Sequence, residues 1–119
     1  MFRGVRGVMC FAESPSTSGR WWAEVLGAEL HLEVEGGSEY AWIDVDGVEF
    51  GFHMRDDTRN PRGGGSPVPY WAVDDVDAVR QHLLNAGCKH HRGPLQVDPN
   101  RKICQLVDPF GVVIGLDGP

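Results

Sequence analysis

A short segment with a glycine at its centre occurs twice in this chain, and the repeat constrains the fold more than any other feature. "GVEFGFH" spans residues 47–53 and "GVVIGLD" spans residues 111–117, so equivalent positions lie 64 residues apart (111 minus 47). Both segments read as strands, although a glycine weakens the interior of a strand. A repeat at about half the chain length indicates an internal duplication.

The elements around the two glycines follow the same order, and we predict an α+β fold of two βαβββ repeats within a single domain, 1–119. Repeat one covers about 3–54, with strands at 3–11, 29–35, 39–45 and 48–54 and a helix that begins near Pro15 and ends at Gly27. Repeat two covers about 68–117, with strands at 68–73, 88–92, 102–107 and 112–117 and a helix from Asp74 or Asp75 to Gly87. The polar segment 55–67, rich in glycine and proline, is predicted to be the linker.

Apolar residues at helical spacing predict which helix faces are buried. In the first helix these are Trp22, Val25 and Leu26, and in the second they are Val76, Val79 and Leu83. One helix cannot bury such a stripe alone, so each is expected to pack on the small sheet of its own repeat.

Composition narrows the classes of function. The chain has 11 basic and 17 acidic residues and a net charge of −6, which argues against nucleic acid as a partner. No apolar run approaches the ~20 residues that cross a membrane, and the N-terminus lacks the pattern of a signal peptide, so we expect a cytoplasmic protein. The three cysteines, Cys10, Cys88 and Cys104, are far apart in the chain and are expected to be reduced and buried.

Three segments resemble the vicinal oxygen chelate superfamily, which includes glyoxalase I, extradiol dioxygenases, fosfomycin-resistance enzymes and bleomycin-resistance proteins. They are "WWAEVLGAEL" at 21–30, "AVDDVDAVRQHLLNAG" at 72–87 and "DPFGVVIGL" at 108–116. The resemblance implies a cupped mixed sheet, glyoxalase/bleomycin-resistance-like, in a homodimer with two equivalent pockets. It is strongest to the metal-free, bleomycin-resistance-type binding proteins.

The resemblance also implies where a metal would bind in related enzymes. Their four ligand positions fall here on Gly7, Gly51, Val68 and Gly115, none of which has a side chain that binds a metal. We therefore predict no metal and no cofactor, and we interpret Gly51 and Gly115 as open pocket floor where a guest approaches the backbone. The alternative is that both glycines mark bulges or tight bends of the sheet.

Strand alternation places further side chains on the face of the sheet that contains these glycines. The predicted ligand-binding residues are Met9, Phe11, Tyr40, Trp42, Glu49, Gly51, His53, Tyr70, Val113, Gly115 and Asp117. The aromatic side chains suit a flat ligand, and Glu49 and Asp117 suit a cationic one; alternatively, the aromatic residues form a dimer interface. His31 and His82 lie among polar residues and are expected to be exposed.

Three functions are compatible with this pattern. The first is a metal-free binding protein that sequesters a small aromatic or cationic natural product, such as an antibiotic, and so confers resistance. The second is a metal-dependent lyase, isomerase or dioxygenase with unorthodox ligands, for which Glu49 and His53 are a carboxylate–imidazole pair on one strand. The third is a metal-free enzyme with His53 as the base. In each case we expect a homodimer, because a small sheet exposes strand edges.

Overall fold

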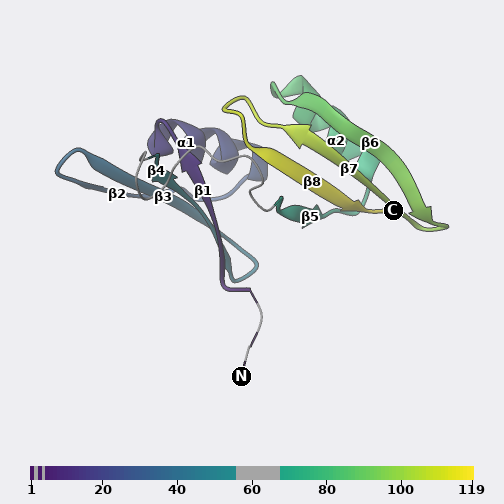
Figure 1. The fold of residues 1–119 in the computed structure, drawn as a ribbon, viewed down its shortest axis with the longest axis horizontal. Helices are drawn as coiled ribbons and strands as arrows, with labels where there is room; N and C mark the ends of the chain where they lie inside the picture. Colours follow the sequence, from purple (N-terminus) through teal and green to yellow (C-terminus); the bar gives the residue numbers. More distant parts are fainter. Residues whose placement is uncertain (2, 4, 56–67) are drawn as a thin grey trace. The chain divides into compact units, whose positions relative to one another are not determined.

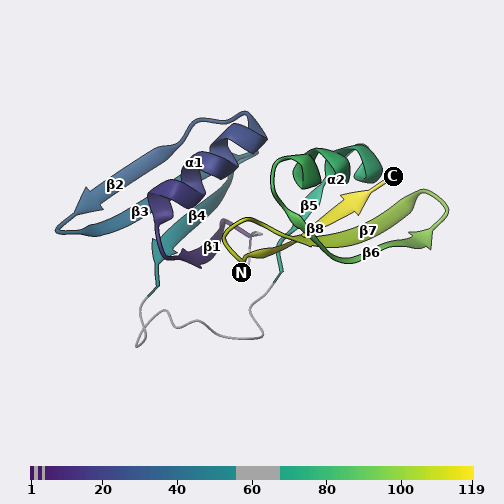
Figure 2. The same ribbon diagram turned by 90° about the horizontal axis from the view of Figure 1, so that it is seen from above.

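The computed structural model describes residues 1, 3, 5–55 and 68–119 and divides into two units, Met1–Gly65 (unit 1) and Ser66–Pro119 (unit 2). In each unit a helix covers one face of a four-stranded mixed sheet (Figures 1 and 2). The predicted α+β fold of two βαβββ repeats is therefore confirmed, with repeat 3–54 in unit 1 and repeat 68–117 in unit 2. Apart from Arg55, the predicted linker 55–67 lies outside the described residues.

Unit 1 contains β1 (Gly7–Ala12), α1 (Pro15–Leu26), β2 (His31–Glu35), β3 (Ser38–Val45) and β4 (Val48–Met54). The strand order is β1-β4-β3-β2, with β1 parallel to β4 and the other neighbours antiparallel. The first strand begins at Gly7 and not at residue 3, because its partner β4 begins only at Val48.

The core of unit 1 lies between α1 and its sheet. The Ser14 hydroxyl caps α1 by accepting from the Thr17 amide, and Pro15 occupies the first turn, where its missing N–H costs nothing. Trp22 is 1% exposed and packs edge-on against Phe50, with ring centroids 5.2 Å apart. Its predicted place in the core is confirmed. Buried sheet residues beneath the helix are Ala41, Ile43, Phe50 and Phe52.

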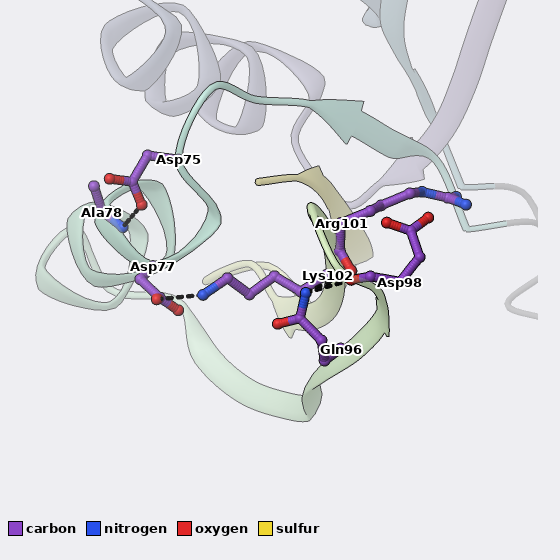
Figure 3. Close-up of polar contacts among 7 residues, drawn as sticks. All are labelled: Asp75, Asp77, Ala78, Gln96, Asp98, Arg101 and Lys102. Atoms are coloured by element: carbon purple, nitrogen blue, oxygen red, sulfur yellow. Dashed lines mark hydrogen bonds and ion pairs between the residues drawn. The ribbon is translucent and has the colours of Figure 1, made fainter.

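Unit 2 contains β5 (Tyr70–Ala72), α2 (Val76–Asn85), β6 (Lys89–Asp98), β7 (Arg101–Val107) and β8 (Val113–Gly118), in the sheet order β5-β8-β7-β6. The Asp75 carboxylate caps α2 by accepting from the Ala78 amide, and Asp77 forms an ion pair with Lys102 of β7 (Figure 3). Val76 and Leu83 are buried, as the helical spacing predicts.

The strand predicted at 88–92 is longer in the structure and runs to Asp98. Gly93 and Pro94 are residues at which a strand is expected to end, but in the structure β6 continues through them with a bulge. Arg92 pairs with Gln105 and Leu95 pairs with Ile103, so two residues of β6 lie opposite one residue of β7. At the far end, the Gln96 amide donates to the main-chain carbonyls of the hairpin turn (Figure 3).

Two further expectations concern the interior and the membrane. Cys10, Cys88 and Cys104 are buried, as predicted, and none of the three forms a disulfide. Burial raises the pKa of the Cys88 thiol to about 11. Neither α1 nor α2, the helices of the described residues, has the length and apolar character of a membrane span.

Candidate functional site

The face of the unit 1 sheet turned away from α1 collects most of the predicted site residues, and we call it the open face of unit 1. Alternation along β3 sends Ala41 and Ile43 to the core and leaves Tyr40 and Trp42 on this face. Strand pairing adds residues of β1 and β4, because directly paired residues share a face. The predicted residues that meet here are Met9, Phe11, Tyr40, Trp42, Glu49, Gly51 and His53.

Four rings stack in a row across this face. His31 stacks on Trp42 with ring centroids 5.2 Å apart, Trp42 on Tyr40 at 5.0 Å, and Tyr40 on His53 at 4.3 Å. The interplanar angles are 19°, 13° and 20°, so each ring is nearly parallel to its neighbour. Offset stacking of this kind is a favourable arrangement of aromatic rings. The row spans β2, β3 and β4, and within it each ring covers part of its neighbour's face.

Tyr40 connects the stack to a carboxylate. Its hydroxyl donates to Glu49 Oε2 at 2.6 Å, a short hydrogen bond to a charged acceptor. Burial raises the pKa of Tyr40 well above its usual value, and the hydrogen bond to Glu49 and the charges of Glu49 and Glu33 raise it further. The phenol therefore stays protonated and continues to donate throughout the neutral range.

The same tyrosine covers Gly51. A Cβ atom at Gly51 would lie 2.7 Å from Tyr40 Oη and 3.0 Å from its Cε1, so the ring occupies the space that a side chain would need. In unit 2 the ring of Tyr70 covers Gly115 in the same way, with Cγ 2.7 Å from a Cβ built there. The interpretation of both glycines as open pocket floor is wrong. Each glycine instead leaves room for the ring of a tyrosine of its own unit.

The predicted residues of unit 2 also share the face turned away from their helix, but their chemistry differs. Tyr70 pairs with Gly115 across β5 and β8, and Gln105 donates to the Tyr70 hydroxyl at 2.7 Å. Asp117 accepts from Arg101 Nε and Nη2, each at 2.7 Å, and this hydrogen-bonded partner lowers the pKa of the carboxyl. Both oxygens that we expected to face a cationic ligand are thus bound to Arg101. Val113, the fourth predicted residue, pairs with Val107 on this face.

Comparison with known proteins identifies the fold. The family model described as "Glyoxalase/Bleomycin resistance protein/Dioxygenase superfamily" matches residues 7–116. The chain belongs to this superfamily.

Solved structures agree with that assignment. A glyoxalase/bleomycin resistance protein/dioxygenase family enzyme from Burkholderia phytofirmans PsJN is 15% identical, with a TM-score of 0.74 over 94% of this chain and 95% of that one. A glyoxalase family protein from Bacillus cereus is 19% identical, with a TM-score of 0.72 over 98% and 93% of the two chains. Another from Enterococcus faecalis is 15% identical, with a TM-score of 0.74 over 98% of each chain. At these identities the likeness establishes the fold alone, and comparison with curated proteins gives no match.

The residues present do not fit the metal site that the superfamily resemblance implies. Gly7, Gly51, Val68 and Gly115 offer no donor atom from a side chain, and tyrosine rings cover two of them. Within residues 1, 3, 5–55 and 68–119, no group of three or more His, Cys, Asp or Glu side chains is placed to hold a metal ion. We therefore derive no chemical step through a metal at these positions.

Sequence reasoning missed one member of the ring stack. His82 is exposed as expected, but His31 is half-buried and stacks on Trp42. Its place follows from the antiparallel pairing of β2 with β3, which puts His31 directly opposite Trp42. Alternation along the strand places His31 and Glu33 on one face and Leu32 on the other. Which residue of β3 lies opposite His31 follows only from the register of the hairpin.

Proposed function

We propose that this member of the superfamily is a metal-free binding protein that sequesters a small, flat, cationic natural product, such as an antibiotic, and so confers resistance. The observation that carries the proposal is the row of four stacked rings on the open face of unit 1, joined to Glu49 through Tyr40. A flat ligand that extends the row by stacking on an uncovered ring face gains about 0.5–1.5 kcal/mol for each good ring pair beyond the area it buries.

The charge of the open face favours a cationic ligand. Glu33 lies opposite Tyr40 on the neighbouring strand, and Asp44 lies opposite Glu49. Three carboxylates, those of Glu33, Asp44 and Glu49, therefore share the face with the four rings. Glu49 uses Oε2 for the Tyr40 hydroxyl, which leaves Oε1 to accept from a ligand. A cation near this group also gains from the aromatic faces, because the ring quadrupole attracts positive charge.

The proposal is tested with a planar cation and its neutral parent. A calorimetric titration of the protein with 9-aminoacridine is expected to show saturable binding. Acridine, at a pH where it is neutral, is expected to bind more weakly. Trp42→Ala should weaken binding of 9-aminoacridine by about 2 kcal/mol, the usual size of a binding hot spot. Trp21→Ala removes a tryptophan of α1 outside the stack and is the matched control. Equal affinity of the two variants for 9-aminoacridine contradicts the proposal.

The competing function is a metal-dependent lyase, isomerase or dioxygenase that uses unorthodox ligands such as Glu49 and His53. The two side chains lie on one face of β4, but the Tyr40 ring stacks on His53 and its hydroxyl occupies one oxygen of Glu49. Elemental analysis of the purified protein separates the two functions. One equivalent of tightly held Fe, Mn, Ni or Zn per chain supports the enzyme and contradicts the binding protein.

The proposal includes a homodimer with two equivalent pockets. Support comes from the edge strand β2, where apolar side chains are exposed: Val34 is 63% exposed and Leu32 is 38% exposed. Unpaired edges with apolar side chains favour association. Light scattering at micromolar protein concentration should give twice the mass of the chain, and a monomer contradicts this part of the proposal.

A further inference from the structure

Unit 2 has a groove of about 360 Å³ formed by β5, β6 and β7. This volume is in the range of small-molecule sites, roughly 300–1,000 Å³. The side chains that line it include Tyr70, Arg92, Leu95, Ile103 and Gln105. Of these, only Tyr70 belongs to the predicted ligand-binding residues.

The bulge in β6 builds one wall of the groove. Arg92 and Leu95 are three residues apart, so in a regular strand their side chains would point to opposite faces. The extra residue of the bulge places them opposite Gln105 and Ile103, which lie two apart on β7 and share a face. Arg92 and Leu95 therefore point to the same side, and both line the groove.

Gly93 makes this geometry possible. Its φ of +79° is in the region that favours glycine, and a Cβ there would lie 2.9 Å from the carbonyl oxygen of Ile103. No other residue fits between β6 and β7 at this point without moving one of the strands. The local sequence thus holds a cationic and an apolar side chain next to each other.

Arg92 carries the single formal charge among the groove residues. Two other cations of this sheet are engaged: Arg101 by Asp117 and Lys102 by Asp77. Arg92 is exposed and makes no hydrogen bond or ion pair within the described ranges, 1, 3, 5–55 and 68–119. The apolar part of the wall is accessible as well, because Leu95 is 59% exposed and Tyr70 is 44% exposed.

We infer that this groove binds a small amphipathic monocarboxylate, with an apolar body between Tyr70, Leu95 and Ile103 and the carboxylate on the Arg92 guanidinium. The planar guanidinium matches a carboxylate through two parallel hydrogen bonds. One guanidinium balances one negative charge, whereas a phosphate monoester carries nearly two and would leave one unmatched. Gln105 donates to the Tyr70 hydroxyl at 2.7 Å, an exposed hydrogen bond that favours this position of the ring.

The inference goes beyond the proposed function, since the groove and the open face of unit 1 share no residue and attract opposite charges. The test uses 2-naphthoate and its uncharged analogue 2-naphthamide, each titrated into the full chain and followed by two-dimensional NMR. We expect saturable binding of 2-naphthoate, with the largest shifts at residues of β6 and β7. Affinity for 2-naphthamide should be lower by about tenfold, because the amide cannot form the charged pair.

Variants assign the effect to Arg92. Arg92→Gln removes the exposed guanidinium charge. The affinity for 2-naphthoate should fall about tenfold, while the affinity for 2-naphthamide should change by no more than about twofold. Lys89→Gln removes the same charge from the same strand outside the groove and is the matched control. Trp42→Ala should leave 2-naphthoate binding unchanged, so failure of the unit 1 site and failure of the groove give different results.

Several outcomes would overturn the inference. They are the absence of saturable 2-naphthoate binding at millimolar concentration, equal affinity for the acid and the amide, and Arg92→Gln binding like the parent protein. A loss in Lys89→Gln as large as that in Arg92→Gln would assign the binding to general surface charge and would overturn it too.

Discussion

The two units share a glycine at equivalent positions of β4 and β8, yet each covers it with a tyrosine from a different strand. Tyr40 reaches Gly51 from β3, while Tyr70 reaches Gly115 from β5. The feature that the two units share is therefore the glycine, whereas the tyrosine that covers it comes from a non-equivalent strand in each unit. The comparison explains why glycine stands in the middle of two strands: a larger residue would displace an aromatic ring.

The chemistry around the two tyrosines differs as much as their origin. In unit 1 the tyrosine lies between Trp42 and His53 and donates to a carboxylate. In unit 2 the tyrosine accepts from Gln105, and an Arg101–Asp117 ion pair lies on the same sheet face. Similar backbones thus present an acidic, ring-rich face in one unit and a groove with an exposed arginine in the other.

The largest expected effect distinguishes the two faces of unit 1. Trp22→Ala should lower the free energy of unfolding by about 3–5 kcal/mol, because the side chain is 1% exposed and packs on Phe50. Trp42→Ala should cost only about 1 kcal/mol, since this ring stacks on the open face and is half-buried. Chemical denaturation measures both values. If Trp42→Ala is the more destabilising variant, the two faces are assigned the wrong way round.

The next effect compares the two glycines. Gly51→Ala should destabilise by about 1–3 kcal/mol, because Tyr40 is held between two rings and by Glu49 and cannot move away freely. Gly115→Ala should cost less, because Tyr70 is 44% exposed and can turn into solvent.

A double variant sharpens this prediction. Tyr40→Phe removes the hydroxyl oxygen nearest to the new Cβ, so Gly51→Ala should cost less in that background than in the parent protein. The denaturation midpoints of the four proteins in this cycle give the coupling. A greater loss for Gly115→Ala than for Gly51→Ala would contradict the difference between the two tyrosines.

The sequence predicts the fold well because the patterns it rests on are local. Apolar spacing placed Trp22, Val76 and Leu83 in the core, and alternation placed Tyr40 and Trp42 together. What covers Gly51 depends on the rotamer of a residue on the neighbouring strand, which no periodicity encodes. The position of His31 opposite Trp42 depends on the register of the β2–β3 hairpin. Arg92 and Leu95 point to the same side because of a bulge in β6, whereas Gly93 and Pro94 in the sequence predict the end of a strand.

The titration of Tyr40 tests its environment with a smaller effect. Its pKa is raised above the usual value of 10.0, so above that pH the unfolded chain releases a proton that the folded chain keeps. The contribution to stability is complete below the usual pKa and is lost as the pH rises toward the folded pKa. In a Tyr70→Phe background Tyr40 is the remaining tyrosine of the sequence, and its tyrosinate absorbance should appear at a higher pH than that of an ordinary tyrosine. Glu49→Gln should move it lower, but still above the usual value, because burial remains the largest cause; an unchanged transition would contradict the hydrogen bond.

The smallest effect concerns the ion pair of unit 2. Arg101 lowers the pKa of the Asp117 carboxyl below its usual 3.8, so the pair stabilises the fold above that value and is lost as the pH falls through the folded pKa. Arg101→Gln should return the pKa of Asp117 toward its usual value, which carboxyl-carbon NMR measures directly. Stability at neutral pH should hardly change, since exposed ion pairs contribute little. A large loss of stability would mean that the pair has a role in folding that its exposure does not suggest.

The proposed binding of a flat cation to the ring stack of unit 1 can be followed directly at the four tryptophan side chains. Three of them, Trp21, Trp22 and Trp71, lie outside the stack, and Trp42 lies within it. During titration with 9-aminoacridine, followed by NMR of the four indole N–H signals, the account predicts a large, saturable shift of the Trp42 signal and much smaller shifts of the other three. Saturable binding that moves the Trp71 signal and leaves Trp42 in place would contradict it.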